Sequence, residues 1–217
     1  MIHLHSLTRF APPPTSDTIF EDVSATLPDN RFCAVFGLAK SGRTTLLQLI
    51  SQKKKPNRGA VFSTVRVSPI ANAASIFHPR LSTLENITLT ARCFGMNALE
   101  LTALAVTLPG FEGELGVASG RLNPKARRGM ETLVAALLPY DVFLLDDIER
   151  IAPEILDVLL KILATRKSGV IFTTRTPKLV EKYANCVTVI RDKKLLTFET
   201  VDAALNDADG ALYQDDE

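Results

Sequence analysis

The stretch "FCAVFGLAKSGRTTLLQLI", residues 32–50, decides the fold of this chain. An apolar run ends at Gly37, and Gly42 follows at the spacing of a phosphate-binding loop, with a helix-forming segment after it. In such a loop successive backbone N–H groups surround an anionic phosphate, and the N-terminus of the helix adds its dipole. The expected phosphate-binding residues are therefore Gly37, Leu38, Ala39, Lys40, Ser41, Gly42, Arg43, Thr44 and Thr45.

One position departs from this pattern, because Arg43 stands where the motif has lysine. The lysine ammonium normally reaches the β- and γ-phosphates, whereas a guanidinium is planar and bulkier. Arginine can still pair with phosphate, but the positioning of the transition state should suffer. The loop therefore either binds a nucleotide in weakened form or keeps only the shape of a tight turn between strand and helix.

A second buried strand is expected at "VFLL", and two carboxylates, Asp146 and Asp147, end it. In P-loop nucleotide hydrolases the first such carboxylate holds Mg²⁺, together with the hydroxyl that Thr44 would supply. The second, usually a glutamate, polarises the attacking water. Asp147 is one methylene shorter, and since catalysis is sensitive to displacements of about 1 Å, we expect a slow base.

The rest of the chain alternates between helical and β patterns. We expect strands at "IHLHSL" and "TIFEDVSATL", a hairpin-like β stretch at "GAVFSTVRV", and strands at "GVIFTT", "CVTVI" and "KLLTF". Helices are expected from Ser82, where Ser82 and Glu85 form a capping box, from Ala98, and at 125–138, 153–165 and 177–184. The acidic tail, 208–217, should be loosely held.

This alternation predicts an α/β fold with a mostly parallel sheet covered by helices on both faces, preceded by an antiparallel β part. A single domain, 1–217, is expected, with a helical subdomain at about 82–138. The formal charge of +1 gives no support for a nucleic-acid partner. Three scattered cysteines fit a reducing cytosol. No segment approaches the ~18 apolar residues of a membrane span, so another chain would have to supply one.

Across almost its whole length the chain resembles an ATP-binding subunit of an ABC transporter, and more narrowly the short subunits of capsular polysaccharide export systems. The resemblance rests on the loop and on "LSTLENITLTARCFG", "LLPYDVFLLDD" and "KLVEKYANCVTVIRDKKL". It implies an ABC-type P-loop fold that binds ATP and Mg²⁺. It also implies a dimer, with itself or with an intact ATPase subunit, on the cytoplasmic face of the inner membrane. This dimer would lie beneath a membrane-spanning subunit, whose coupling helix would dock on the helices at 81–95.

The same resemblance assigns site residues that depart from the family pattern. Phe10 takes the place of the aromatic that stacks on adenine. His78 takes the place of the glutamine that senses Mg²⁺, and Arg175 that of the switch histidine, although a guanidinium accepts no hydrogen bond. Pro124 and Lys125 stand where the signature serine and glycine grip the partner's γ-phosphate, and proline supplies neither hydroxyl nor N–H. A Ser119–Gly120 pair lies about five residues too early, and Pro153 replaces the aspartate of the dimer-contact loop.

Two interpretations follow from these departures. The chain is either the ATP-binding subunit of a polysaccharide exporter with impaired or absent hydrolysis, or a non-enzymatic pseudo-ATPase that serves as a scaffold or regulatory module. In the first, Asp147, His78 and Arg175 are the altered catalytic positions and Thr44 and Asp146 hold Mg²⁺. An unrelated P-loop small-molecule kinase would leave the "LENI" and C-terminal blocks unexplained.

Overall fold

The computed structural model describes residues 1–15, 17–73 and 75–212, with side chains to Asp207. The chain divides into two compact units. The sheet unit comprises Met1–Ile70, Tyr140–Glu149 and the chain from Lys167 onward, and the helical unit comprises Ala71–Pro139 and Arg150–Arg166.

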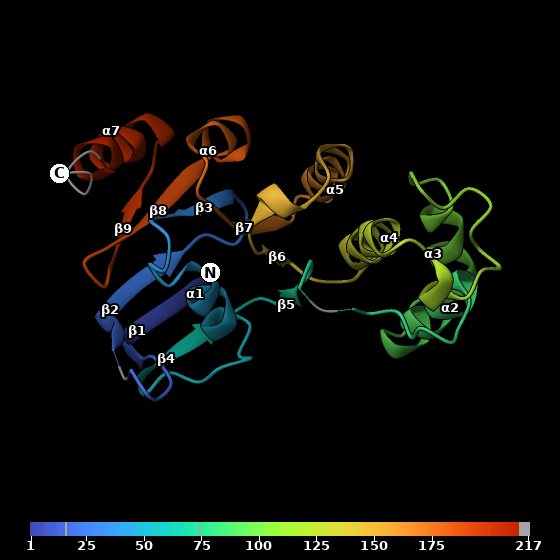
Figure 1. The fold of residues 1–217 in the computed structure, drawn as a ribbon, viewed down its shortest axis with the longest axis horizontal. Helices are drawn as coiled ribbons and strands as arrows, with labels where there is room; N and C mark the ends of the chain where they lie inside the picture. Colours follow the sequence, from blue (N-terminus) through green and yellow to red (C-terminus); the bar gives the residue numbers. More distant parts are fainter. Residues whose placement is uncertain (16, 74, 213–217) are drawn as a thin grey trace. The chain divides into compact units, whose positions relative to one another are not determined.

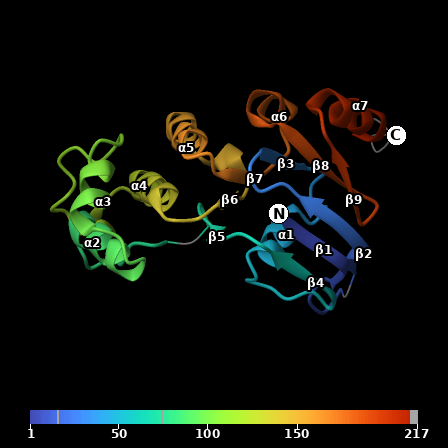
Figure 2. The same cartoon turned by 180° about the vertical axis from the view of Figure 1, so that it is seen from behind.

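The sheet unit contains a three-stranded and a six-stranded sheet (Figures 1 and 2). The small sheet is antiparallel, in the order β2-β1-β4, and is built from β1 (Ile2–Phe10), β2 (Thr18–Leu27) and β4 (Arg58–Ser63). The large sheet has the order β5-β6-β7-β3-β8-β9. Its strands are β3 (Phe32–Phe36), β5 (Val67–Ile70), β6 (Val142–Leu145), β7 (Gly169–Thr174), β8 (Cys186–Arg191) and β9 (Lys194–Phe198).

All neighbours in the large sheet are parallel except β8 and β9. The central strands are short and almost wholly apolar, as expected for strands covered on both faces. The register pairs Phe36 of β3 with Thr174 of β7, and Leu145 of β6 with Phe172 of β7. The residues that follow β3, β6 and β7 therefore meet at the carboxyl edge of the sheet.

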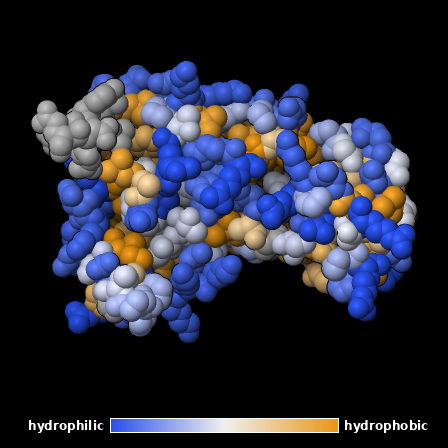
Figure 3. All heavy atoms as spheres, viewed as in Figure 1, coloured by the Kyte–Doolittle hydropathy of each residue, from blue (hydrophilic) through white to orange (hydrophobic). Residues whose placement is uncertain are grey.

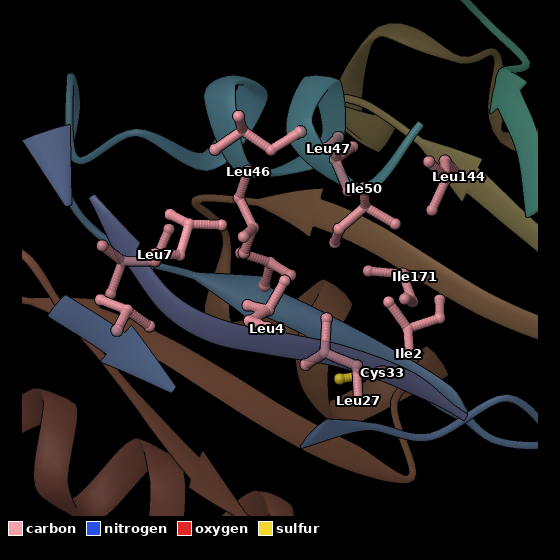
Figure 4. Packing of buried hydrophobic residues seen from close by; sticks show 14 of the residues in the cluster. Ile2, Leu4, Leu7, Leu27, Cys33, Leu46, Leu47, Ile50, Leu144 and Ile171 are labelled. Atoms are coloured by element: carbon pink, nitrogen blue, oxygen red, sulfur yellow. The ribbon is translucent and has the colours of Figure 1, made fainter. Parts of the chain in front are cut away.

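One face of the large sheet packs against helix α1 (Arg43–Ile50) and the small sheet. Figure 4 shows Leu4 and Leu7 of β1 beside Leu46 of α1, in one continuous apolar core. Because α1 is fixed by this burial, its N-terminus is fixed as well. Cys33 of β3 lies in the same core and is in register with the equally buried Cys186 of β8.

The opposite face of the large sheet contacts helices α6 (Pro177–Tyr183) and α7 (Val201–Leu212), which both lie on that side in Figures 1 and 2. Helix α6 contacts β3 and β7, and α7 contacts β8 and β9. The sheet unit therefore has the predicted α/β layering, with helices on both faces of a mostly parallel sheet and an antiparallel N-terminal part.

The helical unit contains four α-helices in the part of the chain that the structure describes. They are α2 (Thr83–Cys93), α3 (Ala98–Ala105), α4 (Pro124–Leu137) and α5 (Pro153–Thr165), with a short 3-10 helix at Ser119–Arg121 before α4. A further 3-10 turn, Ile148–Arg150, follows β6. The predicted capping box is present at α2, where the Ser82 and Glu85 side chains each accept a bond from the other's backbone N–H.

Two sequence-based expectations were wrong. The stretch at 59–67 is no hairpin: β4 joins the small sheet and β5 the large one, because the chain crosses from one sheet to the other between Ser63 and Val67. The tail was expected to be loose from residue 208, but α7 continues to Leu212. The final residues of the expected tail, 213–217, lie outside the part of the chain that the structure describes.

On the face seen in Figure 3 most residues are hydrophilic, and hydrophobic residues show between them in several places. Scattered apolar residues of this kind are normal on soluble domains. Among the helices that the structure describes, none combines the length and apolar character needed to cross a membrane.

Candidate functional site

The loop between β3 and α1 closes tightly. The Ser41 N–H donates to the Leu38 carbonyl at 3.2 Å, and Lys40 and Gly42 have φ values of 64° and 102°. A Cβ added at Gly42 would lie 2.6 Å from Cγ2 of Ile19, so β2 leaves room only for glycine there. Helix geometry leaves the N–H groups of Arg43, Thr44 and Thr45 without intrahelical acceptors at this loop, whereas the Leu46 N–H already donates to the Gly42 carbonyl at 2.8 Å.

Arg43 does not extend outward from the loop, because its side chain is only 9% exposed. Its Nη1 donates to the Gly37 carbonyl at 2.6 Å and to the Thr174 carbonyl at 2.9 Å. Its Nη2 lies 3.9 Å from Oδ1 of Asp147. Burial lowers the pKa of Arg43, while the carboxylates of Asp147 and Glu149 act in the opposite direction. The guanidinium therefore ties the start of the loop to the end of β7.

Thr44 and Asp146 come together as the sequence predicted for a metal pair. The Thr44 hydroxyl donates to both carboxylate oxygens of Asp146, at 3.1 Å and 2.9 Å. Asp146 also accepts from the Thr173 hydroxyl at 2.7 Å. A hydroxyl and a carboxylate in contact are hard oxygen ligands of the kind that Mg²⁺ prefers, and the pair fits that ion.

Asp147 follows at once and bends the chain away from β6. Its backbone is left-handed, with φ of 45°, and its N–H donates to the Thr173 hydroxyl at 2.7 Å. Its carboxylate is mostly buried and lies beside the guanidinium of Arg43.

Glu149 is a site residue that the sequence interpretation missed. Its Oε1 accepts from the Thr174 hydroxyl and the Arg175 N–H, both at 2.6 Å, and from the Thr176 hydroxyl at 3.4 Å. Burial alone would raise the pKa of Glu149, but these hydrogen bonds hold it below its ordinary value. Glu149 follows Asp146 and Asp147 closely in the sequence, and this proximity could have indicated it as a site residue. No motif used in the sequence interpretation includes that position.

Arg175 is thus held by its backbone rather than by its side chain. It follows the last residue of β7 and is exposed, and its N–H is fixed by Glu149. The carboxyl edge of the sheet accordingly gathers Arg43, Asp146, Asp147, Glu149 and Arg175.

Phe10 ends β1 in the small sheet and is half-buried. It is paired with Thr18 of β2, immediately before Ile19, the residue that abuts Gly42. The strand pairing therefore connects the predicted aromatic to the loop through β2. Thr45, by contrast, is half-buried within the first turn of α1.

In the helical unit His78 is exposed, and its Nδ1 accepts from the Arg80 N–H at 3.3 Å. The loop that carries His78 is organised by the buried Asn86, whose Oδ1 accepts from the His78 N–H at 2.6 Å. The Asn86 amide lies within 3.0–3.3 Å of the carbonyls of His78, Leu81 and Ser82 and of the Ser119 hydroxyl. Ser119 therefore supports this loop.

The N-terminus of α4 is capped from within the chain. Asn123 Oδ1 accepts from the Lys125 N–H at 2.9 Å, and Pro124 at the first helical position has no N–H. Part of this helix terminus is thereby already satisfied, and Lys125 is exposed.

Comparison with curated proteins places these features in context. Over 81 residues the chain is 35% identical to the O-antigen export system ATP-binding protein RfbB of Klebsiella pneumoniae, covering 37% of this chain and 33% of that protein. Over 95 residues it is 27% identical to the polysialic acid transport ATP-binding protein KpsT of Escherichia coli, covering 43% of this chain and 42% of that protein. The aligned segment spans about a third of the first relative and less than half of the second. No family model matches the sequence.

Solved structures match almost the whole chain. An ATP-binding subunit of an ABC transporter superimposes with a TM-score of 0.78 at 16% identity, covering 96% of this chain and 93% of that one. An ATP-binding cassette captured as a dimer with ADP and phosphate gives 0.74 at 16% identity, covering 93% and 99%. The predicted ABC-type fold is therefore confirmed, and the curated relatives confirm the resemblance to ATP-binding proteins of polysaccharide export over part of the chain.

Proposed function

We propose that this chain is the ATP-binding subunit of an ABC transporter that exports a capsular or related cell-surface polysaccharide, with impaired or absent hydrolysis. The observation that carries the proposal is the hydrogen bond between Thr44, at the end of a closed phosphate-type loop, and Asp146, at the end of β6. The names of the relatives, which refer to O-antigen export and polysialic acid transport, support the class of cargo. Both compact units form one ATP-binding domain in this proposal, with the helical subdomain at about 82–138.

The sheet unit would hold the nucleotide. The N–H groups of the loop, Gly37 to Thr45, would surround the phosphates and Phe10 would stack on the base. Thr44 and Asp146 would hold Mg²⁺, which supplies charge neutralisation at the phosphates when bound. The roles proposed for the other residues do not depend on the metal.

Hydrolysis should be weak for reasons visible in the contacts. Asp147, in the position of the general base, is one methylene shorter than the usual glutamate, and its Oδ1 lies 3.9 Å from Nη2 of Arg43, so it is poorly placed to reach an attacking water. Arg175 presents a cation where the family has an acceptor. His78 in the helical unit offers one ring nitrogen to the Arg80 N–H and the other to solvent or ligand.

A membrane-spanning subunit is the proposed partner. Helix α2 and the residue that follows it expose Leu84, Leu89 and Phe94, with exposed fractions of 41%, 46% and 37%. Large apolar side chains exposed on a surface helix suit contact with a helix of another protein. The chain would then sit on the cytoplasmic face of the inner membrane, as a dimer with itself or with an intact ATPase subunit.

The alternative function, a non-enzymatic scaffold or regulatory module, is favoured by the N-terminus of α4. Asn123 caps the N–H of Lys125 from within the chain, and Pro124 supplies no donor. A helix that satisfies its own terminus has less to offer a phosphate from a partner subunit.

Thermal unfolding with and without Mg-ATP tests the proposal. A ligand at 100 times its dissociation constant stabilises the native state by about 2.7 kcal/mol, so binding should raise the melting temperature clearly. No shift at millimolar Mg-ATP would favour the scaffold. A phosphate-release assay should detect little or no turnover, and a rate like that of an intact transporter ATPase would contradict the proposed impairment.

A further inference from the structure

The positive charge of Arg43 already interacts with other groups of the protein. One guanidinium nitrogen of Arg43 donates to the carbonyls of Gly37 and Thr174, and the other approaches Asp147. The side chain is buried, so turning it toward a ligand would leave both carbonyls without this donor. Arg43 is therefore poorly placed to replace the lysine of a phosphate-binding loop.

A second cation lies in the same loop. Lys40 is three residues before Arg43, is exposed, and adopts a φ of 64°. This conformation is uncommon for a residue with a side chain, and such strain persists where the surrounding structure demands it. Lysine also carries its charge on a flexible four-carbon stem, which suits contact with a phosphate as a point charge.

The electrostatic setting favours an anion next to Lys40. Lys40 stands just before the N-terminus of α1, where a positive side chain is unfavourable beside the helix dipole. A bound phosphate removes that conflict, because it is attracted by the ammonium and by the free N–H groups of the first turn. A positive charge at position 40 is therefore unfavourable in the free protein and favourable when a phosphate is bound.

We propose that Lys40 supplies the charge that meets the nucleotide phosphates, and that Arg43 is a positioning residue that ties Gly37 to the end of β7. This inference rests on the proposed function, since it assigns roles within the same nucleotide site. It differs from the P-loop pattern, in which the lysine directly before Thr44 would make the phosphate contact.

Equilibrium binding of Mg-ATP and of Mg-tripolyphosphate to the full chain tests Lys40, the second probe reporting on the phosphates alone. Lys40→Ala should weaken the binding of both probes about tenfold, the loss expected for one charge-assisted contact. The melting temperature of the free protein should not fall, because the lysine is unfavourable beside the helix dipole when no ligand is bound. The salt dependence of the dissociation constant should become shallower, because one screened charge has been removed. Lys40→Arg should recover most of the affinity, and Lys53→Ala, an exposed lysine beyond α1, should match the wild type.

Arg43→Lys tests the second part. The shorter lysine has one nitrogen, which cannot both keep the two carbonyl bonds of Nη1 and replace the approach of Nη2 to Asp147, so the melting temperature of the free protein should fall, while the salt dependence of binding stays as in the wild type. An unchanged melting temperature with tighter Mg-ATP binding would overturn the positioning role. Unaltered affinity and salt dependence in Lys40→Ala would overturn the role of Lys40 while leaving the proposed function standing. A wild-type protein that binds neither probe would overturn both.

Discussion

Several side chains at the carboxyl edge of the large sheet make hydrogen bonds that the phosphate-binding motif does not predict. The Thr173 hydroxyl donates to Asp146 and accepts from the Asp147 N–H, so it fixes both carboxylate residues. Glu149 does the same for the turn after β7. The motif identified Thr44 and Asp146 as a pair, but it could not predict where Arg43 points. That direction depends on the Thr174 carbonyl, which long-range register brings beside the loop.

Two glutamates with opposite pKa shifts give a prediction at this scale. In Glu149 the hydrogen bonds from Thr174 and Arg175 outweigh burial and lower the pKa below 4.5. Its contribution to stability is therefore present above the unfolded-state pKa and is lost as the pH falls through the folded-state pKa. Glu149→Gln should destabilise the protein by about 1 kcal/mol at pH 7, a modest loss because the site is partly solvated. The difference should shrink towards pH 4 in urea titrations.

Glu131 of α4 should behave in the opposite way. Burial raises its pKa above 4.5, although the Ser75 hydroxyl and Arg127 lower it in part. The stability it contributes is greatest below the unfolded-state pKa and is lost as the pH rises through the folded-state pKa. Glu131→Gln should therefore be as stable as the wild type or more stable at pH 7, with the advantage disappearing in acid. Parallel pH profiles for the two variants would contradict both assignments.

At the scale of elements, the strands were predicted well where apolar runs are short and bounded, as at β3, β6 and β7. The course of 58–70 was not, because periodicity shows that two strands exist but not which sheet each one joins. Helix α7 was missed, since "TVDAALNDADGAL" carries acidic residues and a glycine that weaken a helical pattern. The capping box at α2 was found because its signature is local.

The loop before α2 gives a prediction of its own. Asn86→Ala removes the acceptor of the His78 N–H and the donors to the neighbouring carbonyls, in a buried position. We expect a loss of about 3 kcal/mol in the free energy of unfolding, measured with urea. Asn97→Ala removes only an exposed N-cap at α3 and should cost about 1 kcal/mol. Equal losses in the two variants would show that the buried hydrogen bonds of Asn86 contribute no more to stability than an exposed N-cap.

At the scale of the whole molecule, the ABC-type architecture followed from the order of motifs along the chain, and nearly complete coverage by ATP-binding subunits confirms it. The division into two compact units followed less directly, because the helical unit draws on two separate segments, 71–139 and 150–166. Because β6 separates α5 from α2 along the chain, the sequence pattern does not indicate that the two helices belong to one unit.

Self-association is the prediction at this scale. Because Asn123 and Pro124 leave α4 with fewer free donors at its N-terminus, we favour the second of the two proposed dimers, the one with an intact ATPase subunit. We therefore expect Mg-ATP to leave this chain alone monomeric in light-scattering measurements. The thermal-shift result would show separately whether the nucleotide is bound. A dimer that appears only with Mg-ATP would mean that two copies of this chain complete each other's sites, which the capped helix argues against.

The buried pair of thiols on β3 and β8 has a practical consequence. The hydrogen bond with Cys186 and burial both raise the pKa of Cys33, whereas the same hydrogen bond lowers the pKa of Cys186. Both sulfurs are buried, so a reagent reaches neither of them in the folded chain. Cys93, at the end of α2, is exposed. A maleimide dye should therefore modify one cysteine in the native protein and all three after denaturation, so that reagent uptake measures unfolding without any substitution.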